Sequence, residues 1–210
     1  MAGVRVIFIP HTQSKGVGMA RALADSLWQG EEYVLQLDAH HRFMESWDER
    51  AIEDLAKCAH PKPLLTGYLP NYQPPHDKKK FTQTELMIRT KEPVIRFGSK
   101  SVAPGRDVPY PGRLMSAHFV FSRSERLQEC RNDSWVYMNG EEAHMSIKLL
   151  LAGWQPFSLY RPIAWHQYGR RAHHHWQDNK GWGDLNRLSI DRIWGEIREY
   201  KNLIGAEDFC

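Results

Sequence analysis

The spacing of apolar residues follows two different patterns along the first third of the chain. Residues 4–9 and 33–37 are short runs of mostly β-branched, aromatic or other apolar residues, which predict strands. Between them, in residues 14–30, apolar positions recur at helical spacing and the segment ends at a glycine. A second helical pattern in residues 46–60 and a third apolar run in residues 62–69 follow. The order strand, helix, strand, helix, strand predicts a doubly wound α/β fold with a mostly parallel sheet flanked by helices.

The polar positions refine this picture. Ser46 and Glu49 have the spacing of a capping box, so we expect Ser46 to cap the second helix. After Tyr68 the chain becomes rich in proline and lysine, and residues 70–80 predict a surface loop. The remaining pattern predicts strands at residues 85–90, 93–99, 114–123 and 156–170, helices at residues 124–131, 140–154 and 189–205, and a loop at residues 171–184.

Composition narrows the class of protein. With 210 residues, 41% of them hydrophobic and 25% charged, the chain has the composition of one globular domain. The net charge of +3 does not argue for nucleic-acid binding, although it suits an anionic ligand. The three cysteines are far apart, which favours reduced thiols over a disulfide framework. Since no signal-peptide pattern and no apolar run of membrane-spanning length is present, we expect a cytoplasmic protein without a membrane partner.

The second predicted strand ends in polar residues that suggest chemistry. Asp38 and His40 follow it directly, and in an extended segment residues two apart point the same way. Ligands of open α/β sheets bind beyond the carboxyl ends of strands. A carboxylate and an imidazole there suit a divalent ion, Mn²⁺ more than Mg²⁺ or Zn²⁺. The alternative is an aspartate that caps the next helix and a histidine on the surface.

Three ordered blocks of sequence resemble a known family. Residues 14–49 resemble the donor-binding half of GT-A glycosyltransferases, and most of all the Skp1-type hydroxyproline N-acetylglucosaminyltransferases. The matching residues are Ala20, Arg21, Gly30, Glu31, Tyr33, Leu35, Gln36, Asp38, His40, Arg42, Phe43, Trp47 and Asp48. Residues 140–154 and 160–170, with the closing helix, are similar to the same family and more distantly to polypeptide N-acetylgalactosaminyltransferases. The likeness runs from about Val4 to about Ile197.

The resemblance implies a fold and a set of site residues. It implies a single GT-A-like, Rossmann-like domain, with residues 1–68 as the donor and metal half and residues 69–210 as the acceptor half. It implies that Asp38, His40 and His166 hold Mn²⁺ or Mg²⁺. The other residues to which it assigns roles are Glu141 and Glu142 as catalytic groups, and Arg21, Asp38, Ala39, Met115, Ser116, Ala117 and Arg170 at the nucleotide-sugar donor.

The resemblance also implies an activity. A sugar, GlcNAc or a related hexose, would move from a UDP-sugar to a hydroxyl on a protein or peptide, with retention of configuration. An acceptor in nucleic acid, such as a modified nucleobase in DNA, or in a glycan stays open. So do a catalytically silent nucleotide- or sugar-binding module and a hydrolase that uses the histidines at residues 173–175. One departure from the family is that the usual first nucleotide-binding strand and helix have no match ahead of residues 4–9.

Overall fold

The computed structural model describes residues 3–75, 77–89, 95–169 and 175–205. The helices are η1 (His11–Gln13), α1 (Val17–Asp25), α2 (Trp47–Ala56), α3 (Arg126–Glu129), α4 (Glu141–Leu151), α5 (His175–Asp178) and α6 (Trp182–Ile204). The strands are β1 (Tyr33–Leu37), β2 (His41–Phe43), β3 (Pro63–Thr66), β4 (Tyr72–Gln73), β5 (Asp77–Lys78), β6 (Thr84–Ile88), β7 (Phe97–Ser101), β8 (Tyr110–Pro111), β9 (Phe119–Arg123), β10 (Gln155–Ser158) and β11 (Ala164–His166). No helix in these ranges is both long and apolar enough to cross a bilayer.

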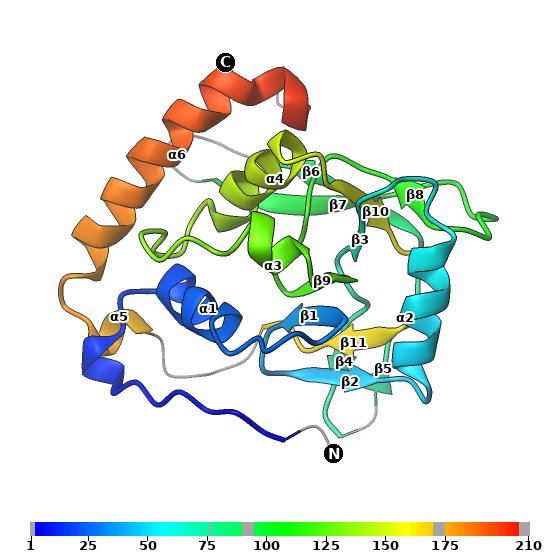
Figure 1. Ribbon diagram of the computed structural model, residues 1–210, viewed down its shortest axis with the longest axis horizontal. Coiled ribbons are helices and arrows are strands. Elements are labelled where there is room, and N and C mark those ends of the chain that lie inside the picture. Colours follow the sequence, from blue (N-terminus) through cyan, green and yellow to red (C-terminus); the bar gives the residue numbers. More distant parts are fainter. Residues whose placement is uncertain (1–2, 76, 90–94, 170–174, 206–210) are drawn as a thin grey trace.

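The central sheet has five strands in the order β1-β9-β3-β10-β8 (Figure 1). The protein is α/β as expected, but the expectation of a mostly parallel sheet is wrong. Only β3 and β10 pair in parallel, and the other three neighbours are antiparallel. The cause is β9, which lies between β1 and β3 and runs opposite to both. Strands β1 and β3 therefore point the same way without being neighbours.

The expected strand at residues 4–9 is also wrong. This segment has no strand pairing within the described chain, and the side chains of Val4 and Phe8 are 92% and 84% exposed. A strand is stabilised by hydrogen bonds to a neighbour, which β-branched composition alone does not supply. Strand β1 is consequently an edge strand of the sheet, paired to β9 alone.

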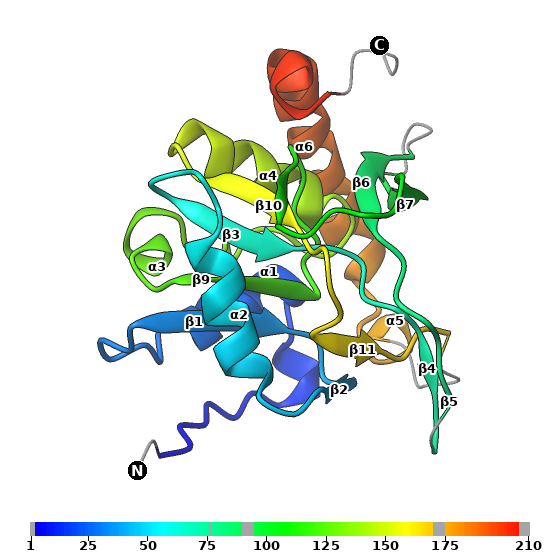
Figure 2. The ribbon, with the colours of Figure 1, turned by 90° about the vertical axis from the view of Figure 1, so that its right-hand side faces the viewer.

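Helices cover both faces of the sheet (Figures 1 and 2). On one face, Leu55 of α2 packs in a core cluster with Phe119 and Phe121 of β9. On the other, Met145 of α4 packs with Val120, the residue between those two phenylalanines. This alternation follows from the two-residue period of a strand. Helix α6 then packs along α4 and encloses a third cluster around Ile193 and Ile197.

Several local expectations need correction. Ser46 precedes α2, but its backbone is left-handed (φ 51°) and its side chain makes no capping hydrogen bond. Normal capping requires an extended N-cap residue, so the box does not form. The expected loop at residues 70–80 contains the paired strands β4 and β5. The expected strand at residues 156–170 is divided into β10 and β11, and α6 begins at Trp182, inside the segment expected to be a loop.

Candidate functional site

Pairing of two short strands assembles the centre of the site. Strand β1 ends at Leu37, residues 38–40 form a bend rather than an extended tip, and β2 begins at His41. Strand β2 pairs antiparallel with β11 in a register that sets His41 opposite His166. Asn71 forms a parallel bridge with His166 from its other side. His166 is thereby held beside the bend.

The bend and β11 bring together the three residues predicted to bind a metal. Asp38, His40 and His166 each offer one ligand atom, and these atoms lie within 4.8 Å of one another. His166 Nε2 is 3.5 Å from Asp38 Oδ2, and His166 Nδ1 is buried without a hydrogen-bond partner among the described residues. Because a buried polar atom without a partner is costly, the group fits a bound cation, whose identity these ligands do not fix.

Electrostatics favour the ionised form of the carboxylate. Burial by itself would raise the pKa of Asp38, but a hydrogen bond with His166 and the positive charge of Arg21 outweigh it and lower the pKa far below its usual value. Burial lowers the pKa of the neighbouring His118 to about 3, so that this imidazole is neutral at physiological pH. An ionised carboxylate is the form in which Asp38 can bind a metal.

Two histidines at the centre were missed by the sequence interpretation. His118 directly precedes β9. Its ring centroid lies 4.5 Å from that of His166, and its Nδ1 is 2.7 Å from Ser116 Oγ. His41 is buried with its ring centroid 4.8 Å from that of His166. His118 stands in an apolar alternation that resembles any core strand, and only the register of β2 with β11 reveals His41.

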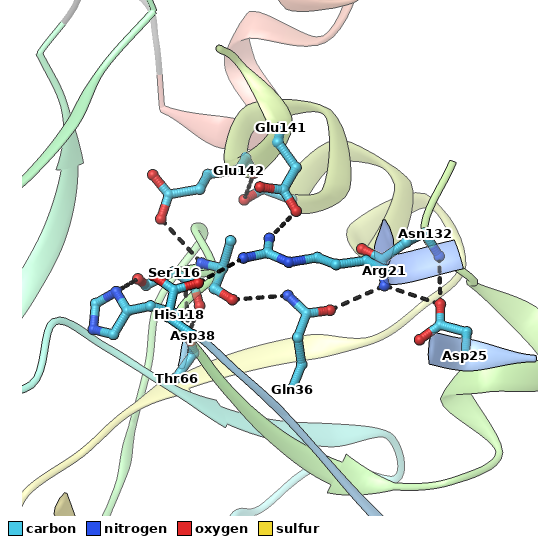
Figure 3. A network of polar contacts seen from close by, with 12 residues as sticks. Arg21, Asp25, Gln36, Asp38, Thr66, Ser116, His118, Asn132, Glu141 and Glu142 are labelled. Atoms are coloured by element: carbon cyan, nitrogen blue, oxygen red, sulfur yellow. Dashed lines mark hydrogen bonds and ion pairs between the residues drawn. The ribbon is translucent and has the colours of Figure 1, made fainter. Parts of the chain in front are cut away.

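Arg21 connects the metal-ligand group to α4 (Figure 3). Its Nη2 donates to Asp38 Oδ1 at 3.1 Å, and its Nη1 donates to Glu141 Oε1. Arg21 reaches this position because α1 packs closely on residues 133–137. A Cβ on Gly18 would lie 2.4 Å from the carbonyl oxygen of Asp133, so the glycine permits the contact.

The two glutamates at the start of α4 differ in their surroundings. Glu141 pairs with Arg21, whereas Glu142 Oε1 accepts a hydrogen bond from the Ala117 N–H (3.0 Å) and Oε2 accepts one from the Tyr68 hydroxyl (3.3 Å). Burial raises the pKa of Glu142 above its usual range despite these bonds. Glu142 is therefore a fixed carboxyl group that holds the backbone of the loop before β9.

The loop expected to lie beneath a donor has its own amide groups occupied. Met115 N–H donates to Ser146 Oγ (2.9 Å) and Ser116 N–H to Thr66 Oγ1 (2.8 Å), and Ala117 N–H goes to Glu142 as described. These bonds stop the alternating pattern at residues 114–123 from forming strand before Phe119. The loop is held rigidly, and its amides are directed into the protein.

A second chain of hydrogen bonds anchors the same loop from β1 (Figure 3). Gln36 Nε2 donates to the Ala117 carbonyl at 2.8 Å, and Gln36 Oε1 accepts from Asn132 Nδ2 at 3.0 Å. Asn132 in turn donates two hydrogen bonds to Asp25 Oδ2 of α1, one from its backbone N–H and one from its side-chain Nδ2. These hydrogen bonds fix α1, β1 and the loop relative to one another.

One pocket joins these features. Its volume is about 560 Å³, which lies within the usual range for small-ligand sites. The predicted site residues that line it are Arg21, Asp38, Ala117, Glu141, Glu142 and His166. His118, Tyr68 and Tyr168 line it as well. We call it the main pocket.

The other predicted donor residues are placed differently. Met115 and Ser116 are buried beneath the main pocket's wall and do not line it, and Ala39 lies in the bend between β1 and β2. Arg170 lies outside the described residues, as do residues 173 and 174 of the histidine run.

These features define an α/β protein with a polar, cation-compatible pocket near the carboxyl end of a strand. The profile of the family described as Glycosyltransferase (GlcNAc) matches residues 1–204, and the chain belongs to this family. None of the curated proteins compared with the chain matches it. Membership supports a glycosyltransferase, with a sugar donor and an acceptor as substrates. It agrees with the wider resemblance found in the sequence without selecting the Skp1-type enzymes.

Proposed function

We propose that the chain is a metal-dependent glycosyltransferase that moves GlcNAc or a related hexose from a UDP-sugar to a hydroxyl acceptor. The observation that carries this proposal is the meeting of Asp38, His40 and His166 in one group, beside Arg21 and next to Glu141. A diphosphate leaving group needs cationic partners. The main pocket is lined by Arg21 and by Asp38 and His166, two of the three proposed metal ligands, whereas His40 does not line it. Residues 1–68 supply Arg21, Asp38 and His40 to the donor and metal side, and residues 69–210 supply His166 to it together with the acceptor side.

The metal site divides the work between protein and ion. Asp38, His40 and His166 hold the ion, and mixed oxygen and nitrogen ligands favour Mn²⁺, with Mg²⁺ as second choice. When bound, the ion stabilises the negative charge that develops on the departing nucleoside diphosphate. Arg21 orients the Asp38 carboxylate through its 3.1 Å hydrogen bond and adds positive charge beside the diphosphate.

The glutamates act on the acceptor side. Glu142, fixed by hydrogen bonds from Ala117 and Tyr68, positions the loop below the sugar. Glu141 lines the main pocket and forms an ion pair with Arg21, which places its carboxylate beside the reacting groups. Retention by front-face substitution needs no protein nucleophile, and it is proposed from the family resemblance.

The test combines binding and turnover. Thermal unfolding is followed with Mn²⁺ or Mg²⁺, alone and with UDP-GlcNAc, and UDP release is measured with hydroxyl-bearing peptides as acceptors. We expect a stabilising shift with Mn²⁺ that is lost in Asp38→Ala and His166→Ala. Asp107→Ala, at an exposed loop position, is the matched control.

The outcomes separate the candidate functions. UDP release that requires Mn²⁺ and an acceptor supports the transferase. Binding of UDP-GlcNAc without turnover on any acceptor indicates a silent binding module, and transfer to a modified DNA duplex alone indicates a nucleic-acid acceptor. A metal shift that survives in Asp38→Ala and His166→Ala as it does in Asp107→Ala excludes the proposed ligands.

A further inference from the structure

A second, smaller hollow of about 270 Å³ adjoins the main pocket. Tyr68 and Tyr168 line both, so the two share a wall. The far side of the smaller hollow is made by Lys79 and Lys80, which follow the β4–β5 hairpin, and by hydroxyl groups of β6 and β7. We call it the lysine pocket. Figure 2 shows the hairpin projecting beside β11, the strand that carries His166.

The lysine pocket has an excess of positive charge. Among the residues that the structure describes, none that lines it is acidic. Lys80 is exposed and has no ion pair within the described chain, and Lys79 pairs only with Asp77, at 3.1 Å on the open surface. An exposed pair of this kind is weak and exchanges readily for another carboxylate. On the main-pocket side of Tyr68, the exposed Arg96 contributes a further cation.

The small polar groups beside the lysines suit a peptide. Thr82, Thr84 and Ser99 line the lysine pocket together with Asn71, and each of these side chains can donate or accept a hydrogen bond. A backbone or carboxylate partner would satisfy such groups. The lining therefore combines positive charge with neutral hydrogen-bonding groups, which is the combination that recognises acidic side chains on an extended chain.

The aromatic residues around the lysines favour a peptide over a nucleic acid. Lys78 Nζ lies 4.4 Å from the ring centroid of Trp165, and Trp165 Nε1 donates to the Lys79 carbonyl at 3.0 Å. Arg42 lies over the ring of Tyr72 in the same way. Binding of single-stranded nucleic acid relies on aromatic faces that are open for base stacking. Trp165 and Tyr72 are engaged by cations. Tyr68 and Tyr168, which line the lysine pocket, pack against the ring of His118, with ring centroids 5.2 and 5.9 Å away.

We propose that the lysine pocket binds acidic residues next to the acceptor hydroxyl, so that the acceptor is an acidic peptide segment. This inference rests on the proposed transferase function and names the substrate class of the same site. The hydroxyl would enter the main pocket while carboxylates of flanking residues meet Lys79 and Lys80 across the wall formed by Tyr68 and Tyr168.

The test measures peptide binding without donor or metal. Two fluorescent peptides share a central hydroxyproline or serine, flanked by Glu and Asp in one and by Gln and Asn in the other. We expect the acidic peptide to bind about tenfold more tightly at low salt, the sum of two exposed charge contacts, and to lose the advantage at high salt. The double variant Lys79→Glu/Lys80→Glu should abolish the preference.

A second double variant is the control for net charge. Lys15→Glu/Lys180→Glu changes the charge by the same amount at exposed positions that line neither pocket, and should keep the preference. Equal binding of both peptides, or equal losses in both double variants, would overturn the proposal. So would a single-stranded oligonucleotide of equal charge that displaces the acidic peptide more strongly than unlabelled peptide does.

This binding test is independent of the transfer assay. If UDP release fails but the acidic peptide still binds in a lysine-dependent way, the proposed function fails and the peptide site stands. If UDP release succeeds with the Gln and Asn peptide as well as with the acidic one, at equal KM, the transferase stands and the lysine pocket is not its acceptor site.

Discussion

The guanidinium of Arg21 donates to the Asp38 carboxylate at 3.1 Å and, through its other terminal nitrogen, to Glu141. One cation thus joins a predicted metal ligand on the loop after β1 to a predicted catalytic residue at the start of α4. Arg21 is only 12% exposed, and Glu141 9%. The single guanidinium thus offsets part of the negative charge of the two carboxylates.

Replacing Arg21 should therefore make the stability of the protein depend on a bound cation. Arg21→Met keeps most of the side-chain volume but leaves the carboxylates of Asp38 and Glu141 facing each other, which we expect to cost about 3 kcal/mol of unfolding free energy. Saturating Mn²⁺ should recover part of this loss, because the ion supplies positive charge at Asp38. Urea unfolding with and without Mn²⁺ measures both effects. Arg50→Met, away from the site, is the control, and an equal loss in the presence of Mn²⁺ would place the ion elsewhere.

The position of Arg21 depends on Gly18. A Cβ there would lie 2.4 Å from the backbone oxygens of Asp133 and Val136, neither of which can rotate away. We expect Gly18→Ala to lower stability by about 1–3 kcal/mol, although alanine is the better helix former. Gly195→Ala in α6 is the matched control, since a Cβ there meets nothing within 4 Å and should add up to about 1 kcal/mol of stability. Chemical denaturation compares the two, and a neutral Gly18→Ala would show that α1 can shift freely.

The metal-ligand group was the part of the site most open to prediction from sequence. Asp38 and His40 are two residues apart, so any compact path of the bend keeps them close, and the resemblance supplied His166. In the structure, His166 is brought to Asp38 and His40 by the pairing of β2 with β11, which the local sequence pattern does not indicate. Such a register depends on contacts between distant segments, as does the burial of His41.

The order of strands in the sheet could not be predicted from the local sequence pattern for the same reason. Residues 33–37, 62–69 and 114–123 were recognised as containing strands, but apolar periodicity carries no information on which strands are neighbours or in which direction they run. Insertion of β9 between β1 and β3 made the sheet mostly antiparallel. At residues 4–9 the composition favoured a strand for which the described chain offers no partner.

The buried side chain of Asn132 links α1 to β1, and a second substitution at its partner tests this link. Asn132 is 6% exposed and its Nδ2 donates to both Asp25 and Gln36. Asn132→Asp keeps the shape but turns a donor into a second carboxylate beside Asp25, and we expect a loss of about 3 kcal/mol. Adding Asp25→Asn removes the repulsion between the two carboxylates and should recover part of the loss, while Gln36 Oε1 stays without its donor. Unfolding of the two single variants and the double variant forms the cycle, and strictly additive losses would contradict the link.

A polar cluster joins α4 to α6 away from the main pocket. His144 Nδ1 is 2.6 Å from Glu196 Oε2, and its Nε2 is 2.8 Å from Asp133 Oδ2. Lys148 Nζ also contacts Asp133 Oδ2, at 2.6 Å. His144 and Lys148, both on α4, therefore hold Asp133, in the segment after α3, against α4.

The contribution of Asp133 should depend on pH. Burial alone would raise the pKa of Asp133, but the bonds from Lys148 and His144 outweigh it and lower the pKa below 3.8. A depressed pKa stabilises the fold above the unfolded value, and the effect is lost as pH falls through the folded value. Asp133→Asn should therefore cost about 1–3 kcal/mol near pH 7, with the difference from wild type closing as the pH falls through the lowered pKa of Asp133. Urea unfolding across this range measures it, and the exposed Asp191→Asn should show no such trend. A difference that stays constant with pH would mean that Asp133 acts through shape rather than charge.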